Sequence, residues 1–101
     1  MDFKLTNYAL FQFGKDVGAK TPLEAISKMN VISQGYSFEG QEILARLIQH
    51  GSKVSYEEAF DYVLDTDFLT DKVIPAINDY VKPFVEVAEK IEKKKVAKAE
   101  V

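Results

Sequence analysis

The chain has 101 residues, of which 47% are hydrophobic and 29% charged, and its formal net charge at pH 7 is −3. This size and composition predict a single folded domain rather than a disordered or fibrous chain. The absence of cysteine excludes disulfides and thiolate metal sites and suits a reducing compartment. Residues 1–20 lack the pattern of a signal peptide, and no apolar run approaches the roughly 20 residues of a membrane helix. We therefore expect a cytoplasmic protein with no membrane partner.

The first part of the chain predicts a short lead-in followed by a helix. Residues 3–6 alternate apolar and polar side chains, which favours a short strand or an extended segment. Thr6 or Asn7 can cap the helix, and Gly18 supplies the left-handed residue with which helices commonly end. We expect its buried side to carry Leu10, Gly14 and Val17, widened by the aromatic residues Tyr8, Phe11 and Phe13.

A second helix is predicted directly after this stop. Thr21 is a cap, Pro22 suits the first helical position, and Glu24 completes a capping box by reaching back. The helix carries Leu23, Ile26 and Met29 and is expected to end near residue 30, before a loop around Gly35.

Two further capped segments predict a third and a fourth helix. Ser37 opens the third, whose apolar residues recur with helical spacing, and Gly51 is expected to end it. Residues 55–58 form another capping box, and the fourth helix is expected to run to about Asp65. The apolar positions of the two helices are Ile43, Leu44, Leu47 and Ile48 in the third and Tyr56, Ala59, Phe60, Val63 and Leu64 in the fourth.

From Phe68 to Ile91, apolar residues recur every three or four positions, which predicts one long helix or two joined ones. Pro75 and Pro83 each remove a helical hydrogen bond, so we expect a bend at one of them. The whole pattern predicts an all-α bundle of about five helices over residues 1–91, followed by a basic, flexible tail at 92–101.

The residues do not form a recognisable catalytic, metal or cofactor site. The run from Asp65 to Asp71 fails as a calcium loop, because Leu69 and Thr70 stand where a ligand and the turn glycine are needed. Its acids are better explained as helix-terminal residues. His50 is the only histidine and is expected to be structural, at the end of the third helix. We expect no enzyme, no cofactor and no metal.

The distribution of charge and of apolar residues indicates the kind of partner. Residues 55–71 carry six acids and no Lys or Arg, which argues against binding to nucleic acid. Phe11, Ile74 and Val85 lie off the main apolar lines of their helices. Either the core is wider than those lines, or these three residues form exposed surface that contacts a protein partner.

Several stretches, in this order, resemble the tail assembly chaperones of long-tailed bacteriophages. "NYALFQFGKDVGAKTPLEAI" (Asn7–Ile26) is similar to that family's first helix, closing turn and short second helix. "ILARLIQHG" (Ile43–Gly51) resembles its middle helix, and "VSYEEAFDYVLD" (Val54–Asp65) resembles its capped helix with Glu-Glu-Ala. The last helix agrees in position and character, so the resemblance covers about residues 3–90.

The resemblance implies a non-catalytic function in the cytoplasm of an infected host. The chain would coat the apolar helices of the tape measure protein and keep them soluble until tail tube subunits polymerise around them. Phe11, Ile74 and Val85 would then be the partner contacts, and self-association stays open. The family often has a longer, frameshifted form, with which the Lys93–Lys95 run is compatible.

Three alternatives belong to other classes of protein. A small helical adaptor or regulator would use the acidic face from Glu57 to Asp71 to bind a basic partner. A structural virion subunit would remain in the finished particle. An enzyme would require activity that depends on His50.

Overall fold

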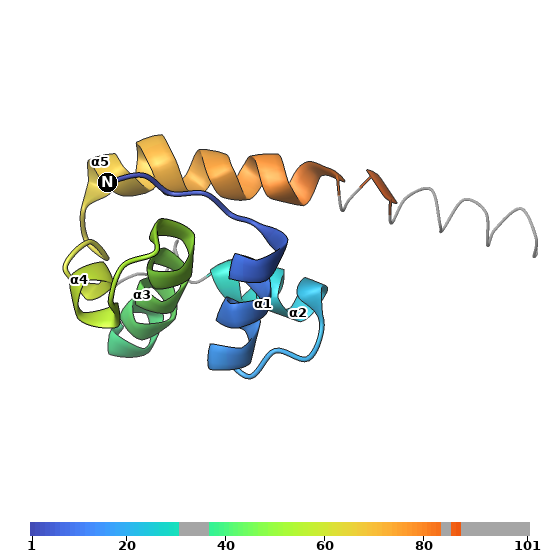
Figure 1. Cartoon of the computed structure of the whole chain (residues 1–101), viewed down its shortest axis with the longest axis horizontal. Helices are drawn as coiled ribbons and strands as arrows, with labels where there is room; N and C mark the ends of the chain where they lie inside the picture. Colours follow the sequence, from blue (N-terminus) through green and yellow to red (C-terminus); the bar gives the residue numbers. More distant parts are fainter. Residues whose placement is uncertain (31–36, 84–85, 88–101) are drawn as a thin grey trace, which may run out of the picture.

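The computed structural model describes residues 1–30, 37–83 and 86–87, and over these residues the protein is all-α, as predicted (Figure 1). No strand occurs within those ranges. The helices are α1 (Asn7–Asp16), α2 (Pro22–Lys28), α3 (Phe38–Ser52), α4 (Tyr56–Phe60) and α5 (Thr66–Phe68). A π-helical turn (Leu69–Val73) continues α5 into helical residues 74–83. We call residues 66–83 the C-terminal helix.

The helices form a small bundle beneath the C-terminal helix. α3 packs against α1 and α4, and α1 packs against α2. The N-terminal segment is extended and runs beside the C-terminal helix (Figure 1). The Lys4 backbone N–H donates to the carbonyl of Gly51 at 3.0 Å, and the Lys72 ammonium lies 4.0 Å from the carboxylate of Asp2. The predicted lead-in is thus an extended strap across the bundle, held by α3 and by the C-terminal helix.

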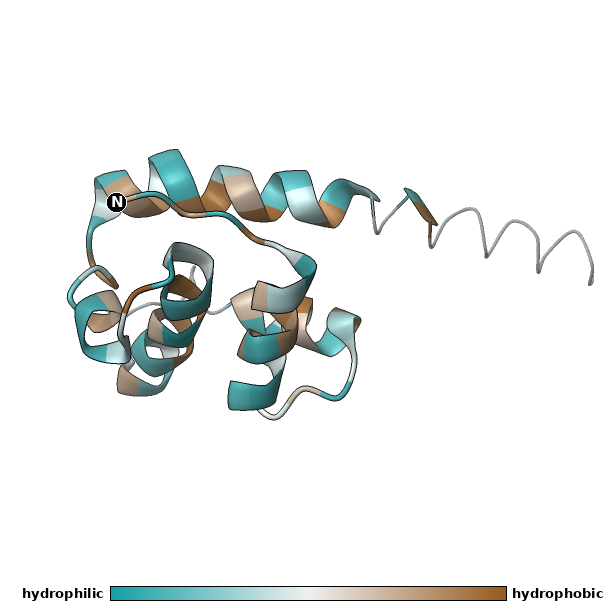
Figure 2. Ribbon diagram, in the orientation of Figure 1, coloured by the Kyte–Doolittle hydropathy of each residue, from teal (hydrophilic) through white to brown (hydrophobic). Residues whose placement is uncertain are grey.

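Apolar side chains from all parts of the fold meet in one core. The hydrophobic faces of the helices turn toward one another (Figure 2), although several large apolar side chains, among them Phe11 and Leu64, remain exposed. Within the described ranges no polar or charged residue is buried. The largest fully buried side chains are Phe13, Leu47, Ile48 and Val73.

The predicted helix starts are confirmed by their caps. Hydroxyl oxygens accept a backbone N–H three residues later at 3.0–3.1 Å, which satisfies a donor that the first helical turn leaves free. Glu24 differs in one detail, because its carboxylate accepts the N–H of Lys20 at 2.7 Å and not that of the cap residue. The four hydroxyl caps are Thr6, Thr21, Ser37 and Ser55.

Two predicted helix ends are wrong. α3 continues through Gly51 to Ser52, and the left-handed residue after it is Lys53, with φ 56°. α4 ends at Phe60, because the chain then makes successive i→i+3 hydrogen bonds, the tighter pattern of 3₁₀ turns, up to Asp65. These turns bury Val63 and leave Leu64 64% exposed, whereas a continued helix was expected to bury both.

The C-terminal helix contains the π-helical turn immediately before Pro75. The Ile74 N–H donates to the carbonyl of Leu69, an i→i+5 bond. A proline within a helix has no N–H and presses on the carbonyl four residues earlier, so a widened turn at this point relieves both problems. The irregularity found beside Pro75 is therefore a π turn, where the sequence predicted a bend.

The same turn determines which side chains reach the core. Phe68 and Val73 are both buried, although positions five apart in a regular α-helix point about 140° away from each other. An i→i+5 turn brings such positions onto one side. The predicted end of this helix at Ile91 and the predicted tail at 92–101 lie outside the described residues, and after Pro83 only residues 86–87 are described.

Candidate functional site

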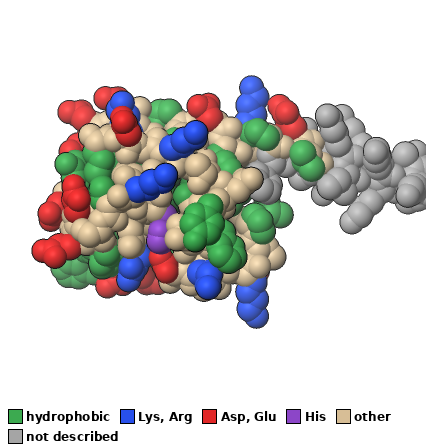
Figure 3. Space-filling model, viewed as in Figure 1, with side chains coloured by type: hydrophobic (Ala, Val, Ile, Leu, Met, Phe, Trp, Pro, Cys, Tyr) green, Lys and Arg blue, Asp and Glu red, His purple; other side chains and the backbone are tan. Residues whose placement is uncertain are grey.

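Two aromatic side chains of α1 point away from the core. Tyr8 and Phe11 are 67% and 60% exposed, and their rings stack with centroids 6.3 Å apart and planes at 25°. Hydrophobic side chains gather over α1, beside the only histidine (Figure 3). The prediction that the aromatic residues of this helix lie on its buried side is right for Phe13, which is fully buried. It is wrong for Tyr8, and for Phe11 the alternative of an exposed position is the one observed, because residues three apart share one face and this face turns to the outside.

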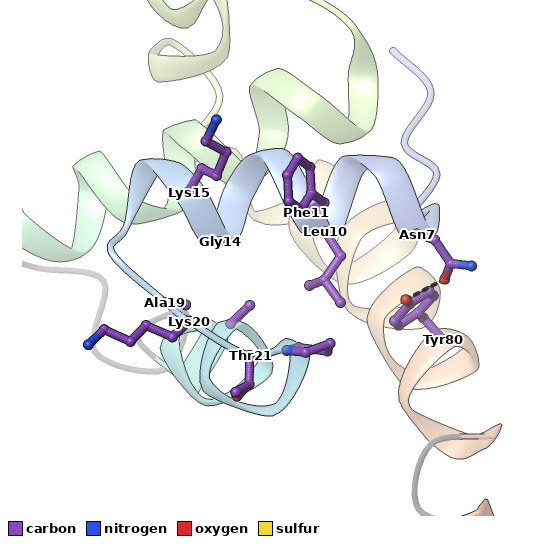
Figure 4. A pocket seen from close by; sticks show the side chains of 11 residues that line it. Asn7, Leu10, Phe11, Gly14, Lys15, Ala19, Lys20, Thr21 and Tyr80 are labelled. Atoms are coloured by element: carbon purple, nitrogen blue, oxygen red, sulfur yellow. Dashed lines mark hydrogen bonds between the residues drawn. The ribbon is translucent and has the colours of Figure 1, made fainter.

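Phe11 forms one wall of a groove between α1 and α2. The groove has a volume of about 310 Å³, near the lower end of the range of ligand pockets. Its base is made of small residues: a Cβ built on Gly14 would lie 3.5 Å from the Cβ of Ala25 and 3.7 Å from that of Ala19. Figure 4 shows Phe11, Leu10 and Tyr80 around this base. The remaining lining residues are Asn7, Lys15, Lys20, Thr21 and Pro22.

The charged side chains of the groove are both cationic. Lys15 and Lys20 line it, and no Asp or Glu does among the described residues. The Lys15 ammonium lies 5.7 Å from the centroid of the Phe11 ring, within the range of a cation–π contact. Over the ranges that the structure describes, neither lysine ammonium forms an ion pair. The groove thus combines an apolar interior with a positive rim.

Tyr80 connects the C-terminal helix to the start of α1. Its hydroxyl donates to the side-chain carbonyl oxygen of Asn7 at 2.6 Å (Figure 4). Burial raises the pKa of Tyr80 above its ordinary value of 10.0, because the charged phenolate loses hydration. The contact fixes one end of the groove between segments 73 residues apart in the sequence.

A second groove lies between α2 and the C-terminal helix. Its volume is about 440 Å³. Ile74 lines it and is 37% exposed, and its surroundings are mainly aliphatic. The other lining residues are Ile26, Met29, Asn30, Ile77, Asn78 and Val81. α2 therefore has an apolar groove on each of two sides.

His50 holds two helices together. It lies in the last turn of α3, as predicted, and its Nε2 is 2.5 Å from the Asp16 carboxylate at the end of α1. No group of three or more metal-binding side chains occurs in the part of the chain that the structure describes. The contact joins the end of α1 to the end of α3 across 34 positions of sequence.

Asp65 acts as a helix cap. Its carboxylate accepts the backbone N–H of Phe68 at 3.0 Å at the start of α5. The carboxylate is thereby directed at a helix terminus, in agreement with the interpretation of the acidic run as helix-terminal residues.

Phe11 and Ile74, predicted as partner contacts, line different grooves on either side of α2. Val85 lies outside the described residues. Sequence reasoning missed the groove itself, since it placed Gly14 on the buried line of its helix and did not connect Gly14 with Ala25. Tyr80 lies within the predicted last helix, and nothing in its local pattern indicates a bond to Asn7.

No known protein family, curated protein or solved structure matches this chain. Within the described residues, no helix combines the length and apolar character required to cross a bilayer.

Proposed function

We propose that this protein is a non-catalytic tail assembly chaperone that binds the tape measure protein of a long-tailed phage and helps to recruit tail tube subunits. The observation that carries the proposal is the pair of apolar grooves beside α2, with Phe11 and Ile74 exposed at their edges. Together with the order of helices that resembles this family, the grooves supply what a holder of apolar helices needs.

Grooves between helices commonly bind an amphipathic helix of a partner protein. Such a helix presents apolar side chains at intervals of three and four residues, and each anchor fills a depression in the groove. Large exposed apolar side chains around such depressions add contact area that water would otherwise cover. In this proposal the tape measure segment lies along α2 and inserts side chains on both sides of it.

The test is co-expression with a segment of the tape measure protein that is insoluble when produced alone. We expect the segment to become soluble and to purify with the chaperone. Equal insolubility with and without the protein would remove the basis of the proposal. The position of the gene, between those of the major tail protein and the tape measure protein, would be independent support.

Two matched variants test whether the solubilising effect in the co-expression assay depends on the groove. Phe11→Ser is expected to reduce recovery of the soluble segment. Phe38→Ser is the control, because Phe38 is 80% exposed and lines neither groove. If both variants reduced recovery equally, exposed aromatic residues in general and not the groove would account for the binding.

A second candidate, an acidic adaptor or regulator, is favoured by one observation. All six acids between Glu57 and Asp71 are exposed. Binding to a basic partner through this face would be lost in moderate salt, whereas the apolar part of binding through the grooves would persist, because salt screens exposed charges and not apolar contact.

A further inference from the structure

We propose that the groove between α1 and α2 selects a partner helix in which the inserted apolar side chain is flanked by acidic residues. This inference rests on the proposed function, since it assigns the chemistry of the partner at one of the two grooves. It also makes a statement that the proposed function does not require: the partner segment at this place is acidic.

The interior of the groove is built to receive a side chain. Gly14, Ala19 and Ala25 keep the base open, because none of them carries an atom beyond Cβ. Leu10 and the exposed ring of Phe11 provide apolar walls. One large apolar side chain of a partner helix fits this combination of base and walls better than a polar ligand does, because few polar groups converge on the interior.

The charged rim of the groove determines which residues of the partner helix are favoured beside the inserted side chain. Lys15 and Lys20 line the groove, which has no carboxylate among its described lining residues, and their ammonium groups extend outward from it rather than into its interior (Figure 4). Neither of the two nearest acids in sequence lines the groove: Asp16 contacts His50, and the Glu24 carboxylate accepts the backbone N–H of Lys20 at 2.7 Å. A glutamate one turn before or after the inserted residue would meet an ammonium, and a lysine there would be repelled.

This preference is opposite to the one expected for the chain as a whole. With a formal charge of −3, the protein would favour basic partners if net charge alone decided. Selection of an acidic helix therefore distinguishes binding in this groove from nonspecific attraction to the acidic surface.

The experiment compares two synthetic helical peptides. Both carry the same stripe of leucines, and their polar positions are Glu in one and Lys in the other. Binding to the full chain is measured by fluorescence anisotropy, and the location by amide shifts in NMR spectra. We expect the acidic peptide to bind about tenfold more tightly, the scale of two favourable rim contacts, with shifts in residues 7–25 and at Tyr80.

A double charge reversal tests the two lysines. Lys15→Glu with Lys20→Glu is expected to reverse the preference between the peptides. Lys4→Glu with Lys53→Glu changes the net charge equally at exposed positions outside the groove and is expected to retain it. No binding, equal binding of the two peptides, an equal effect of the two double variants, or shifts confined to the groove of Ile74 would each overturn the inference.

The two proposals fail in different ways. If the peptides are not distinguished but the tape measure segment is still kept soluble, the acidic-partner inference is wrong and the chaperone proposal stands. If the peptides behave as expected but the segment stays insoluble, the groove has the inferred specificity and the chaperone proposal is wrong.

Discussion

The ring of Phe3, in the N-terminal strap, packs directly on the backbone of Gly51 near the end of α3. A Cβ on Gly51 would overlap this ring, at 2.6 Å from Cδ2 and 2.7 Å from Cζ. The adjacent bond from Lys4 N–H to the Gly51 carbonyl fixes the strap in the same place. Close approach of Phe3 thus explains why a glycine occupies a buried position inside a helix, where glycine is otherwise unfavourable.

Gly51→Ala is expected to lower the free energy of unfolding by up to about 2 kcal/mol. Forcing an extra group into a packed site usually costs about 1–3 kcal/mol, and the higher helix propensity of alanine offsets about 1 kcal/mol of that cost. Unfolding by denaturant, followed by circular dichroism, measures it. Gly14→Ala is the control, since its Cβ would meet only ordinary contacts, and it is expected to be neutral or stabilising.

Phe11 and Phe13 are expected to respond differently to the same substitution. Phe13→Ala should cost about 3–5 kcal/mol, because it removes a fully buried ring from the core. Phe11→Ala should cost about 0.5 kcal/mol or less, the scale of a surface contact such as its stacking on Tyr8. A comparable loss of stability in both variants would contradict the assignment of Phe11 to an exposed wall of the groove.

Tyr80 should make stability depend on pH in the alkaline range. Because burial raises its pKa in the folded protein, the folded state holds the phenolic proton more tightly than the unfolded state. This contribution is complete below about pH 10 and is lost as pH rises through the raised folded pKa. Tyr80→Phe is expected to be less stable at pH 7, since it lacks the bond to Asn7, but to lose less stability on going from pH 9 to 11. Tyr8→Phe is the matched control, since it removes a phenolic hydroxyl from an exposed ring.

Asp65 should behave as a cap. Asp65→Ala is expected to lower the free energy of unfolding by about 1 kcal/mol, whereas Asp67→Ala, at an exposed position inside α5, should have a smaller effect. The melting temperature should be the same in calcium and in EDTA. Stabilisation by calcium that disappears in Asp65→Ala would instead identify the acidic run as a cation site.

The helix starts could be predicted because each depends on residues close in sequence. At the start of α2, for example, the Thr21 hydroxyl accepts the N–H of Glu24, only three positions later. The end of α3 could not be predicted, since Gly51 is required by Phe3, 48 positions earlier. The groove could not be predicted either, because it is formed by residues from different elements. Its base brings Gly14 next to Ala25, and its end brings Asn7 next to Tyr80. Periodicity places residues on a helix face, but neighbouring helices determine whether that face is covered.

The π turn before Pro75 also has a genetic consequence. Removal of one residue between Leu69 and Val73 would convert the turn into regular α-helix, because Phe68 and Val73 would then stand four positions apart, the spacing that shares one helix face. The residues after the turn would keep their sides, so Tyr80 would still face Asn7 and Ile77 would still face α2. A loss of three nucleotides in this short window is therefore one of the few single-residue deletions within a helix that both grooves are expected to survive.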